Sequence, residues 1–283
     1  MKNLITYFFL KSISIFFICL PRIISIKIGE KLGALIYYMF PKRKQVALSN
    51  LNIAFPNKNK NEILSLLKNT YTHYAILITE FLRQKNIDLD KINIHIDEKT
   101  KKILSSDSGQ ILMTAHMGNW EMTIPILSTF KKVSAVVKIQ NNSGGDKFIQ
   151  ENRKFNNTTL IPMRGSRKKM MNSLFDGNIL ILASDQNAGD RGTKIPFFGR
   201  ETSIPKGAAF FHHKTKCSII VGFCIMNKDY SYDFKLRELD IINSPDIKKL
   251  CIDVNSKYSK LLEDEVIKHP EQYFWFHRKW GKI

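Results

Sequence analysis

A short apolar run that ends in a histidine organises this sequence. Ile111–Ala115 has the length and composition of a buried β-strand, and His116 follows it directly. Gly118 and Asn119 then break the strand, and the apolar residues from Trp120 onward favour a short helix. The pattern therefore predicts a buried strand that delivers an imidazole to a turn at the edge of a sheet.

His116 and Glu121 are the candidate catalytic residues. A histidine exchanges a proton near neutral pH, and a carboxylate on one ring nitrogen directs the other toward a substrate. Glu121 lies five positions after His116, so a turn can bring its carboxylate to the ring. We expect Glu121 to orient His116 as a general base, with the amides of Gly118 and Asn119 near the reacting oxygen. The competing interpretation is a structural histidine, since this spacing also occurs by chance.

A second polar pair follows another predicted strand. Ile179–Ala183 is an apolar run, and Asp185 and Gln186 come just after it. In a parallel sheet with crossover helices, functional residues gather at the carboxyl ends of the strands. We therefore expect Asp185 and Gln186 to contribute to a substrate-binding site with His116.

The N-terminal residues predict two membrane-associated helices, within 1–45. Leu4–Leu20 is seventeen residues with one charge, Lys11; a helix of this length spans roughly 25 Å, slightly less than the ~30 Å hydrocarbon core. Apolar residues then recur at three-to-four spacing over Ile24–Met39, and Lys42–Lys44 follows. The basic residues place the following domain on the cytoplasmic side. Spanning and interfacial positions both remain open, and ordinary core helices are the alternative.

Residues 46–283 alternate helical and β-rich patterns without an internal repeat or a low-complexity linker. A chain of 283 residues can form one large or two small domains, and the absence of a linker favours one. The predicted fold is α/β: a single domain with a central, mostly parallel or mixed β-sheet flanked by helices, after the N-terminal membrane-associated helices.

The chain is strongly basic, with 44 Lys and Arg against 25 Asp and Glu and a formal net charge of +19. Such an excess suits an anionic partner, which can be a nucleic acid, an acidic protein or anionic lipid. We do not expect nucleic acid, because no reader motif is present and the N-terminus is hydrophobic. Arg153 and Arg164 are candidate phosphate contacts, with ordinary surface charge as the alternative.

The four cysteines of the chain are expected to serve in packing. Cys19, Cys217, Cys224 and Cys251 show no C-x-x-C spacing, so we expect small apolar core residues and neither a metal site nor a disulfide framework. No cofactor is expected.

In Pro196–Gly199, Phe198 and Gly199 either line an acyl-chain groove or belong to a plug over the core, and composition does not decide between them.

The ordered set of motifs resembles the late lipid A acyltransferases of Gram-negative bacteria, a branch of the lysophospholipid acyltransferase-like superfamily. The matching segments are His116–Glu121, Arg164–Gly165, Ala183–Gln186, Pro196–Gly199 and Pro270–Arg278. The likeness covers nearly the whole chain. Lys138 departs from it, because family members often have arginine there.

The resemblance implies transfer of a fatty acyl group from a thioester, on acyl carrier protein or acyl-CoA, to a hydroxyl of a lipid A precursor. It also implies a location at the cytoplasmic face of the bacterial inner membrane, in contact with its lipids. A glycerophospholipid or amino-acid-linked lipid acceptor is the first alternative. A nucleic-acid-binding protein and a non-catalytic membrane scaffold are the others. The sequence does not specify acyl-chain length or the modified hydroxyl.

Overall fold

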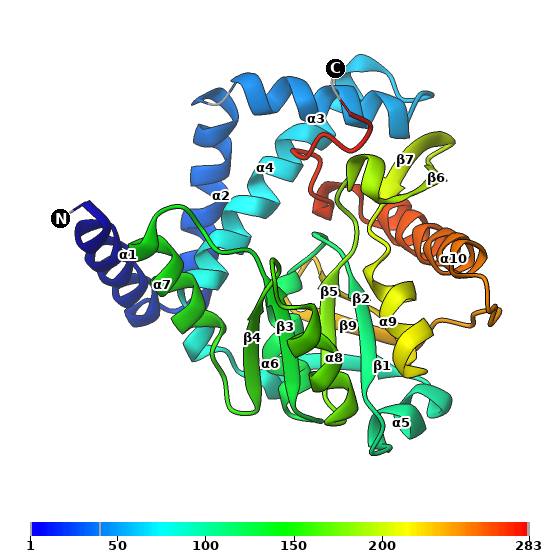
Figure 1. Cartoon of the computed structure of the whole chain (residues 1–283). Coiled ribbons are helices and arrows are strands. Elements are labelled where there is room, and N and C mark those ends of the chain that lie inside the picture. The colour runs from blue at the N-terminus through cyan, green and yellow to red at the C-terminus, as the bar shows by residue number, and fades with distance from the viewer. Residues whose placement is uncertain (1, 40, 282–283) are drawn as a thin grey trace.

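A seven-stranded mixed sheet forms the centre of the molecule, in the order β1-β9-β8-β2-β5-β3-β4 (Figure 1). The computed structural model describes residues 2–39 and 41–281. The strands are β1 (Ile92–Ile96), β2 (Gln110–Thr114), β3 (Val133–Val137), β4 (Thr158–Pro162), β5 (Ile179–Ala183), β8 (Ser218–Met226) and β9 (Tyr232–Glu238).

The direction of the strands sets where the site lies. Strands β8, β2, β5, β3 and β4 run parallel to one another, whereas β9 is antiparallel to β8, and β1 is parallel to β9. Every residue of β2 is buried, as expected for a strand covered on both faces. The predicted α/β fold with a mixed sheet is confirmed.

Helices cover both faces of the sheet. They are α4 (Lys60–Leu82), α5 (Glu98–Ser105), α6 (Thr123–Ser128), α8 (Arg167–Phe175), α9 (Gly207–Thr215) and α10 (Ile247–Lys268). A further helix, α7 (Ser143–Arg153), lies to the side of the sheet, where Phe148 packs with Leu82 of α4. Alternate residues of β2 enter two different cores. Ile111 and Met113 pack in the core that includes residues of α4 and α10, whereas Leu112 packs with residues of α5 and α6.

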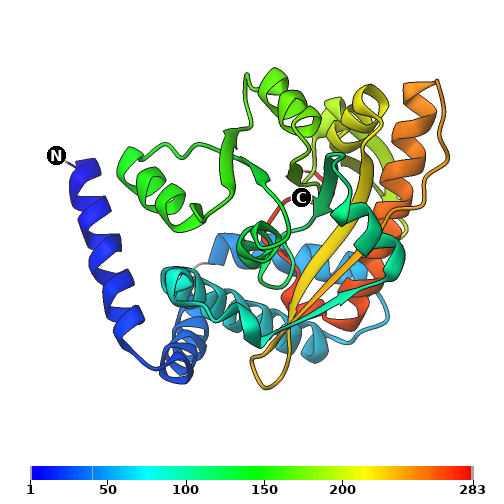
Figure 2. The same cartoon turned by 90° about the horizontal axis from the view of Figure 1, so that it is seen from below.

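The N-terminal segment forms three helices, α1 (Lys2–Cys19), α2 (Arg22–Met39) and α3 (Pro41–Ala54). Helix α1 lies at the edge of the molecule beside α7, and α2 packs along α4 (Figure 2). Ala47 and Leu51 of α3 are fully buried in the main core. The predicted boundary at residue 45 therefore falls inside a helix that belongs to the body of the domain.

Helices α1 and α2 expose an apolar surface. By length and composition, α1 can cross a membrane, and only Ser14 and Phe17 of this helix are buried. The exposed apolar residues of the two helices are Leu4, Ile5, Phe8, Phe9, Ile15, Phe16, Ile23, Ile24, Leu32, Leu35, Tyr38 and Met39. Apolar area of this extent marks a surface that contacts a membrane or another protein.

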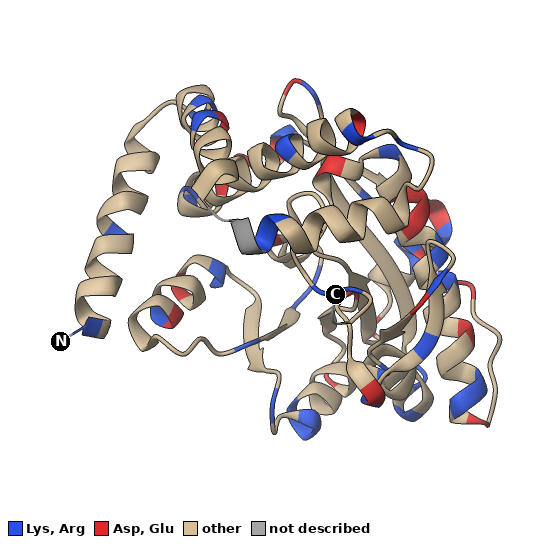
Figure 3. Ribbon diagram, turned by 90° about the horizontal axis from the view of Figure 1, so that it is seen from above, with Lys and Arg blue, Asp and Glu red and all other residues tan. Residues whose placement is uncertain are grey.

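The positive charge is dispersed. Lys and Arg occur on many elements, with Asp and Glu interspersed among them (Figure 3). Cys217, Cys224 and Cys251 are buried, in agreement with the packing expected of them, but Cys19 is exposed at the end of α1. Within the described residues, no group of three or more His, Cys, Asp and Glu side chains is arranged to hold a metal ion.

Candidate active site

His116 and Asp185 meet at the carboxyl ends of β2 and β5. Thr114 of β2 is in register with Ala183 of β5, and each of the two site residues lies two positions further along its own chain segment. The Ser184 amide donates to the Thr114 carbonyl at 2.9 Å, which continues the ladder past the strands. As a result, Nδ1 of His116 lies 2.8 Å from Oδ1 of Asp185.

The expected contact between Glu121 and the His116 ring is wrong, because Asp185 occupies that place. Trp120–Met122 forms a 3₁₀ turn, and Glu121 pairs instead with Arg153 at the end of α7. Arg153 Nε and Nη2 donate to the two carboxylate oxygens at 2.8 and 2.5 Å, and Trp120 Nε1 donates to Oε1 at 3.0 Å. The guanidinium fork is therefore occupied by Glu121, contrary to the expected phosphate contact.

The electrostatics favour the charged form of the His116–Asp185 pair. Burial disfavours the imidazolium, but the charge and hydrogen bond of Asp185 outweigh it and raise the pKa of His116. Burial likewise opposes ionisation of Asp185, yet His116 and Lys279 hold the pKa of this carboxyl below its usual value. The Asp185 side chain is 3% exposed and that of His116 is 25% exposed, so the ring remains accessible.

The turn after His116 is fixed by its main chain. Gly118 has φ +57°, and a Cβ at this position would lie 2.0 Å from the Cys224 carbonyl oxygen. The Gly118 amide donates to Gln272 at 2.9 Å, and the Asn119 amide donates to Cys224 at 2.7 Å. Both amides thus bond within the protein. Neither meets the expectation of contact with the reacting oxygen, because the C-terminal segment accepts the Gly118 amide and β8 accepts the Asn119 amide.

The C-terminal segment, residues 270–280, covers both loops of the site. The Phe274 amide donates to the His116 carbonyl at 2.9 Å, and the Lys279 ammonium donates to the Asp185 carbonyl. His277 Nε2 accepts the amide proton of Asn187 at 3.0 Å. Figure 1 shows this segment in red, beside α3, α4 and the hairpin of β6 (Thr193–Phe197) and β7 (Arg200–Ile204). In the sequence, Pro270–Arg278 stood out only as one of the motifs that carry the family resemblance, and its contacts with the site loops were not predicted.

An apolar cavity of about 540 Å³ lies beside the pair. It is lined by Ile36, Arg43, Tyr71, Tyr74, Ala75, Leu77, Ile78, Phe81, Trp120, Glu121, Phe274, Phe276 and His277. Trp120 and Phe274 connect it to the site, with ring centroids 5.2 and 6.0 Å from that of His116. Helix α4 supplies much of the wall, a role that its apolar periodicity did not reveal.

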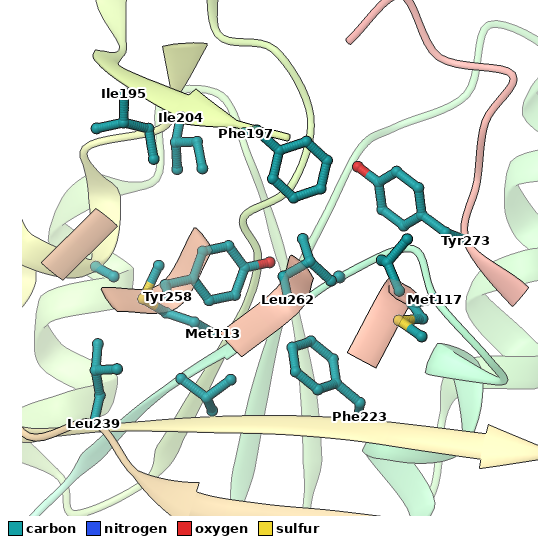
Figure 4. Packing of buried hydrophobic residues seen from close by; sticks show 14 of the residues in the cluster. Met113, Met117, Ile195, Phe197, Ile204, Phe223, Leu239, Tyr258, Leu262 and Tyr273 are labelled. Atoms are coloured by element: carbon teal, nitrogen blue, oxygen red, sulfur yellow. The ribbon is translucent and has the colours of Figure 1, made fainter. Parts of the chain in front are cut away.

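The Pro196–Gly199 segment plugs the core and does not line this cavity. Phe198 and Gly199 form the turn between β6 (Thr193–Phe197) and β7 (Arg200–Ile204), with φ values of +51° and +70°. Such a turn suits a two-residue hairpin. Phe197 is fully buried among the residues of Figure 4, and Phe198 packs against Phe55 with ring centroids 5.5 Å apart (Figure 4).

Two other predicted residues lie near the same edge of the sheet. Gln186 directly follows Asp185 and is half-buried, and Arg164 is exposed in the loop between β4 and α8. Neither lines the apolar cavity. Because β4 is parallel to β3 and β3 to β5, the loop that carries Arg164 leaves the sheet at the edge where His116 lies.

The fold and site define an α/β protein with a histidine–carboxylate pair at the strand ends, beside an apolar cavity. Comparison with known proteins is consistent with this class. The profile of the bacterial lipid A biosynthesis acyltransferases matches residues 2–282. The chain belongs to this family, as the sequence motifs had indicated, and is an O-acyltransferase.

Individual relatives are distant. The chain is 20% identical over 269 residues to the lipid A biosynthesis palmitoleoyltransferase of Escherichia coli (strain K12), covering 92% of this chain and 86% of that protein. The same values hold for a lipid A biosynthesis acyltransferase of Shigella flexneri. Among solved structures, it is similar to the 1-acyl-sn-glycerophosphate acyltransferase of Thermotoga maritima, with 13% identity, a TM-score of 0.35, and coverage of 86% and 97% of the two chains.

Proposed function

We propose that this protein transfers a fatty acyl chain from a thioester to a hydroxyl of a lipid A precursor, with His116 as general base. The observation that carries the proposal is the His116–Asp185 pair beside an apolar cavity. Asp185 accepts a hydrogen bond from Nδ1–H of His116, which leaves Nε2 free to face the substrate. A buried carboxylate on one nitrogen of a partly exposed imidazole is the arrangement used in general-base catalysis of acyl transfer.

The reaction proceeds in a ternary complex. The acceptor hydroxyl gives its proton to Nε2 of His116 while its oxygen bonds to the thioester carbonyl carbon, and the carbonyl electrons move to oxygen. Asp185 stabilises the imidazolium that forms. When the tetrahedral intermediate collapses, the C–S bond breaks and the thiolate leaves with the proton from His116. The products are the ester and the free thiol, and the imidazole is neutral again.

Glu121 acts in this mechanism as a positioning residue. Its two oxygens hold Arg153 and the indole of Trp120, and the Trp120 ring lies against that of His116. Its negative charge also contributes to raising the pKa of His116. Glu121 therefore supports the base through its neighbours and its charge, and Asp185 orients the ring.

The acyl chain occupies the apolar cavity. The volume of about 540 Å³ is in the range of ordinary ligand sites, roughly 300–1,000 Å³. Its walls are mainly aliphatic and aromatic side chains, and Arg43 and His277 add polar groups. A chain that enters past Trp120 would leave its thioester carbonyl next to the imidazole.

Acyl carrier protein or acyl-CoA supplies the chain, and both donors are anionic. The net charge of +19 favours encounter with such donors, an effect that salt screens. Arg164 is exposed in a loop at the same edge of the sheet and is the remaining candidate for a phosphate group of the acceptor. The exposed apolar residues of α1 and α2 would hold the enzyme at the cytoplasmic face of the inner membrane, in contact with its lipids.

The test uses the full chain purified in detergent and then returned to lipid vesicles. The enzyme is incubated with a lipid A precursor and acyl-loaded carrier protein, and the masses of the products are measured by mass spectrometry. We expect an added acyl mass on the lipid A precursor, and a rate roughly 10²–10⁴-fold lower for His116→Ala. Raising the salt concentration should slow the reaction if the donor is carrier protein.

The matched control is His95→Ala, because His95 is an exposed histidine on β1 away from the cavity, and it should retain wild-type activity. Parallel incubations use a lysoglycerophospholipid or an amino-acid-linked lipid as acceptor. Acylation of one of these acceptors alone would refute the lipid A assignment while preserving the chemistry. Undiminished turnover by His116→Ala would refute the general-base mechanism.

A further inference from the structure

Glu80 of α4 is a buried acidic residue that the mechanism above does not use. Its side chain is 2% exposed. The same half of α4 contacts the His116 turn through His73 and Tyr74, and α4 packs along α2. A buried carboxylate needs a partner of opposite charge or several hydrogen bonds. The partners of Glu80 therefore indicate what the residue holds in place.

On one side, Glu80 holds the start of α2. Arg22 Nε and Nη2 donate to Glu80 Oε2 at 3.0 and 2.8 Å. Arg22 Nη2 also donates to the Tyr230 carbonyl at 2.6 Å, and the guanidinium lies over the ring of Tyr232 at 5.3 Å. Arg22 is the first residue of α2, the helix whose outer surface is apolar.

On the other side, Glu80 reaches the His116 turn. The Tyr232 hydroxyl donates to the same oxygen, Oε2, at 3.0 Å, and Asn119 Nδ2 donates to the Tyr232 hydroxyl at 3.0 Å. Burial raises the pKa of Tyr232, so the phenol stays protonated and donates toward Glu80. Asn119 is 2% exposed, and its backbone amide donates to the Cys224 carbonyl.

These contacts converge on Glu80 Oε2. Arg22 donates to this oxygen from one side, and from the other Asn119 donates to the Tyr232 hydroxyl, which donates to Glu80. Each hydrogen bond is buried or partly buried, and buried hydrogen bonds in series reinforce one another. Asn119 lies three residues after His116 and one before Trp120, so its side chain is anchored within the turn that presents the base.

We propose that Glu80 and Tyr232 are positioning residues that couple the seating of α2 against the domain to the placement of the His116 turn. The inference rests on the proposed role of His116 as general base. It adds that turnover depends on a hydrogen-bonded connection between the apolar N-terminal helices and the site. When α2 is seated, Arg22 neutralises Glu80, and Glu80 then fixes Tyr232 and Asn119.

The test is Tyr232→Phe in the full chain, assayed in lipid vesicles over a range of donor concentrations with saturating acceptor. Phenylalanine keeps the ring and removes the hydroxyl that joins Glu80 to Asn119. We expect kcat to fall about tenfold, the equivalent of one buried hydrogen bond, while KM for the acyl donor stays unchanged. Glu80→Gln, which keeps the shape and removes the charge, should lower kcat to a similar extent and serves if Tyr232→Phe does not fold.

Tyr230→Phe is the matched control. The Tyr230 hydroxyl donates to Glu30 of α2 at 2.7 Å, so this variant also loses a tyrosine contact to α2 but leaves Asn119 untouched. It should keep the wild-type kcat. If both tyrosine variants slow turnover equally, or if Tyr232→Phe is as fast as wild type, the coupling is refuted.

A double-variant cycle with Arg22→Ala separates coupling from simple loss of stability. If Arg22 acts through Tyr232, the double variant should be no slower than the slower single variant, whereas independent effects on kcat would multiply. Multiplying effects would therefore overturn the inference. The outcome is independent of the His116→Ala assay, which tests the proposed function by itself.

Discussion

Nδ1 of His116 is hydrogen-bonded to Oδ1 of Asp185 at 2.8 Å, although 69 positions separate the two residues in the chain. The contact follows from strand register, since each residue lies two positions beyond the pair Thr114 and Ala183. The carboxylate that serves the histidine thus comes from the neighbouring strand, whereas the nearby Glu121 is bound to Arg153.

The pH dependence of turnover should report this pair. Only neutral His116 accepts a proton, so kcat/KM should rise with pH as the imidazolium loses its proton. Asp185 and Glu121 raise the pKa of His116, and burial and Arg153 lower it, with a net increase above the usual 6.5. The midpoint should therefore lie above pH 6.5. Asp185→Asn should move it to lower pH and reduce kcat roughly 10²–10⁴-fold.

Glu121→Gln provides the comparison for that experiment. Glu121 shifts the pKa of His116 only through its charge, whereas Asp185 adds a hydrogen bond to the ring. In Glu121→Gln, the pH midpoint of kcat/KM should move to lower pH, as in Asp185→Asn, but by a smaller amount. A larger displacement for Glu121→Gln than for Asp185→Asn would identify Glu121 as the partner of the ring in solution.

The Glu121–Arg153 pair should be required for stability. The two side chains are 9% and 21% exposed, so removal of either leaves a mostly buried charge without its partner. We expect Arg153→Met to lower the free energy of unfolding by about 3–5 kcal/mol, measured by denaturant titration. The double variant Glu121→Gln/Arg153→Met should recover part of this loss, and strictly additive losses would contradict a direct pairing.

The cavity should limit acyl-chain length. Ile78 lines it from α4 and is 56% exposed, so a larger side chain can be accommodated there without disturbing the core. Ile78→Trp should shift the preferred donor to shorter chains, as measured by product masses from a mixture of thioesters. Ser65→Trp, on an exposed position of the same helix outside the cavity, should leave the preference unchanged. An identical shift in both variants would argue against the cavity as the acyl site.

Gly118→Ala should disrupt the turn after β2. A side chain there requires φ near +57° and meets the Cys224 carbonyl; the unfavourable conformation alone costs about 1–2 kcal/mol. We expect a lower unfolding temperature and loss of activity. Gly145→Ala is the control, because a Cβ at this helical position meets nothing closer than 3.6 Å. If Gly118→Ala is as stable as this control, the turn geometry is not required.

Much of the architecture could be predicted from local patterns. The apolar run at 179–183 is β5 with the predicted bounds, and the run at 111–115 is β2 displaced by one residue. These runs are informative because a strand buried on both faces must be apolar throughout. The β6–β7 hairpin was not predicted, since its turn places Phe198 at positive φ, a conformation that a bulky side chain rarely adopts.

By itself, the sequence determined that a histidine and an acidic residue each follow a buried strand, and that the chain begins with an apolar helix. Those properties depend on composition and on periodicity over a few residues. Only the tertiary structure decided that β5 lies beside β2, that Asp185 rather than Glu121 meets His116, and that α4 and residues 270–280 enclose the cavity. The physical reason is that strand order and register arise from the packing of the whole domain, and local spacing in the sequence carries no information about that packing.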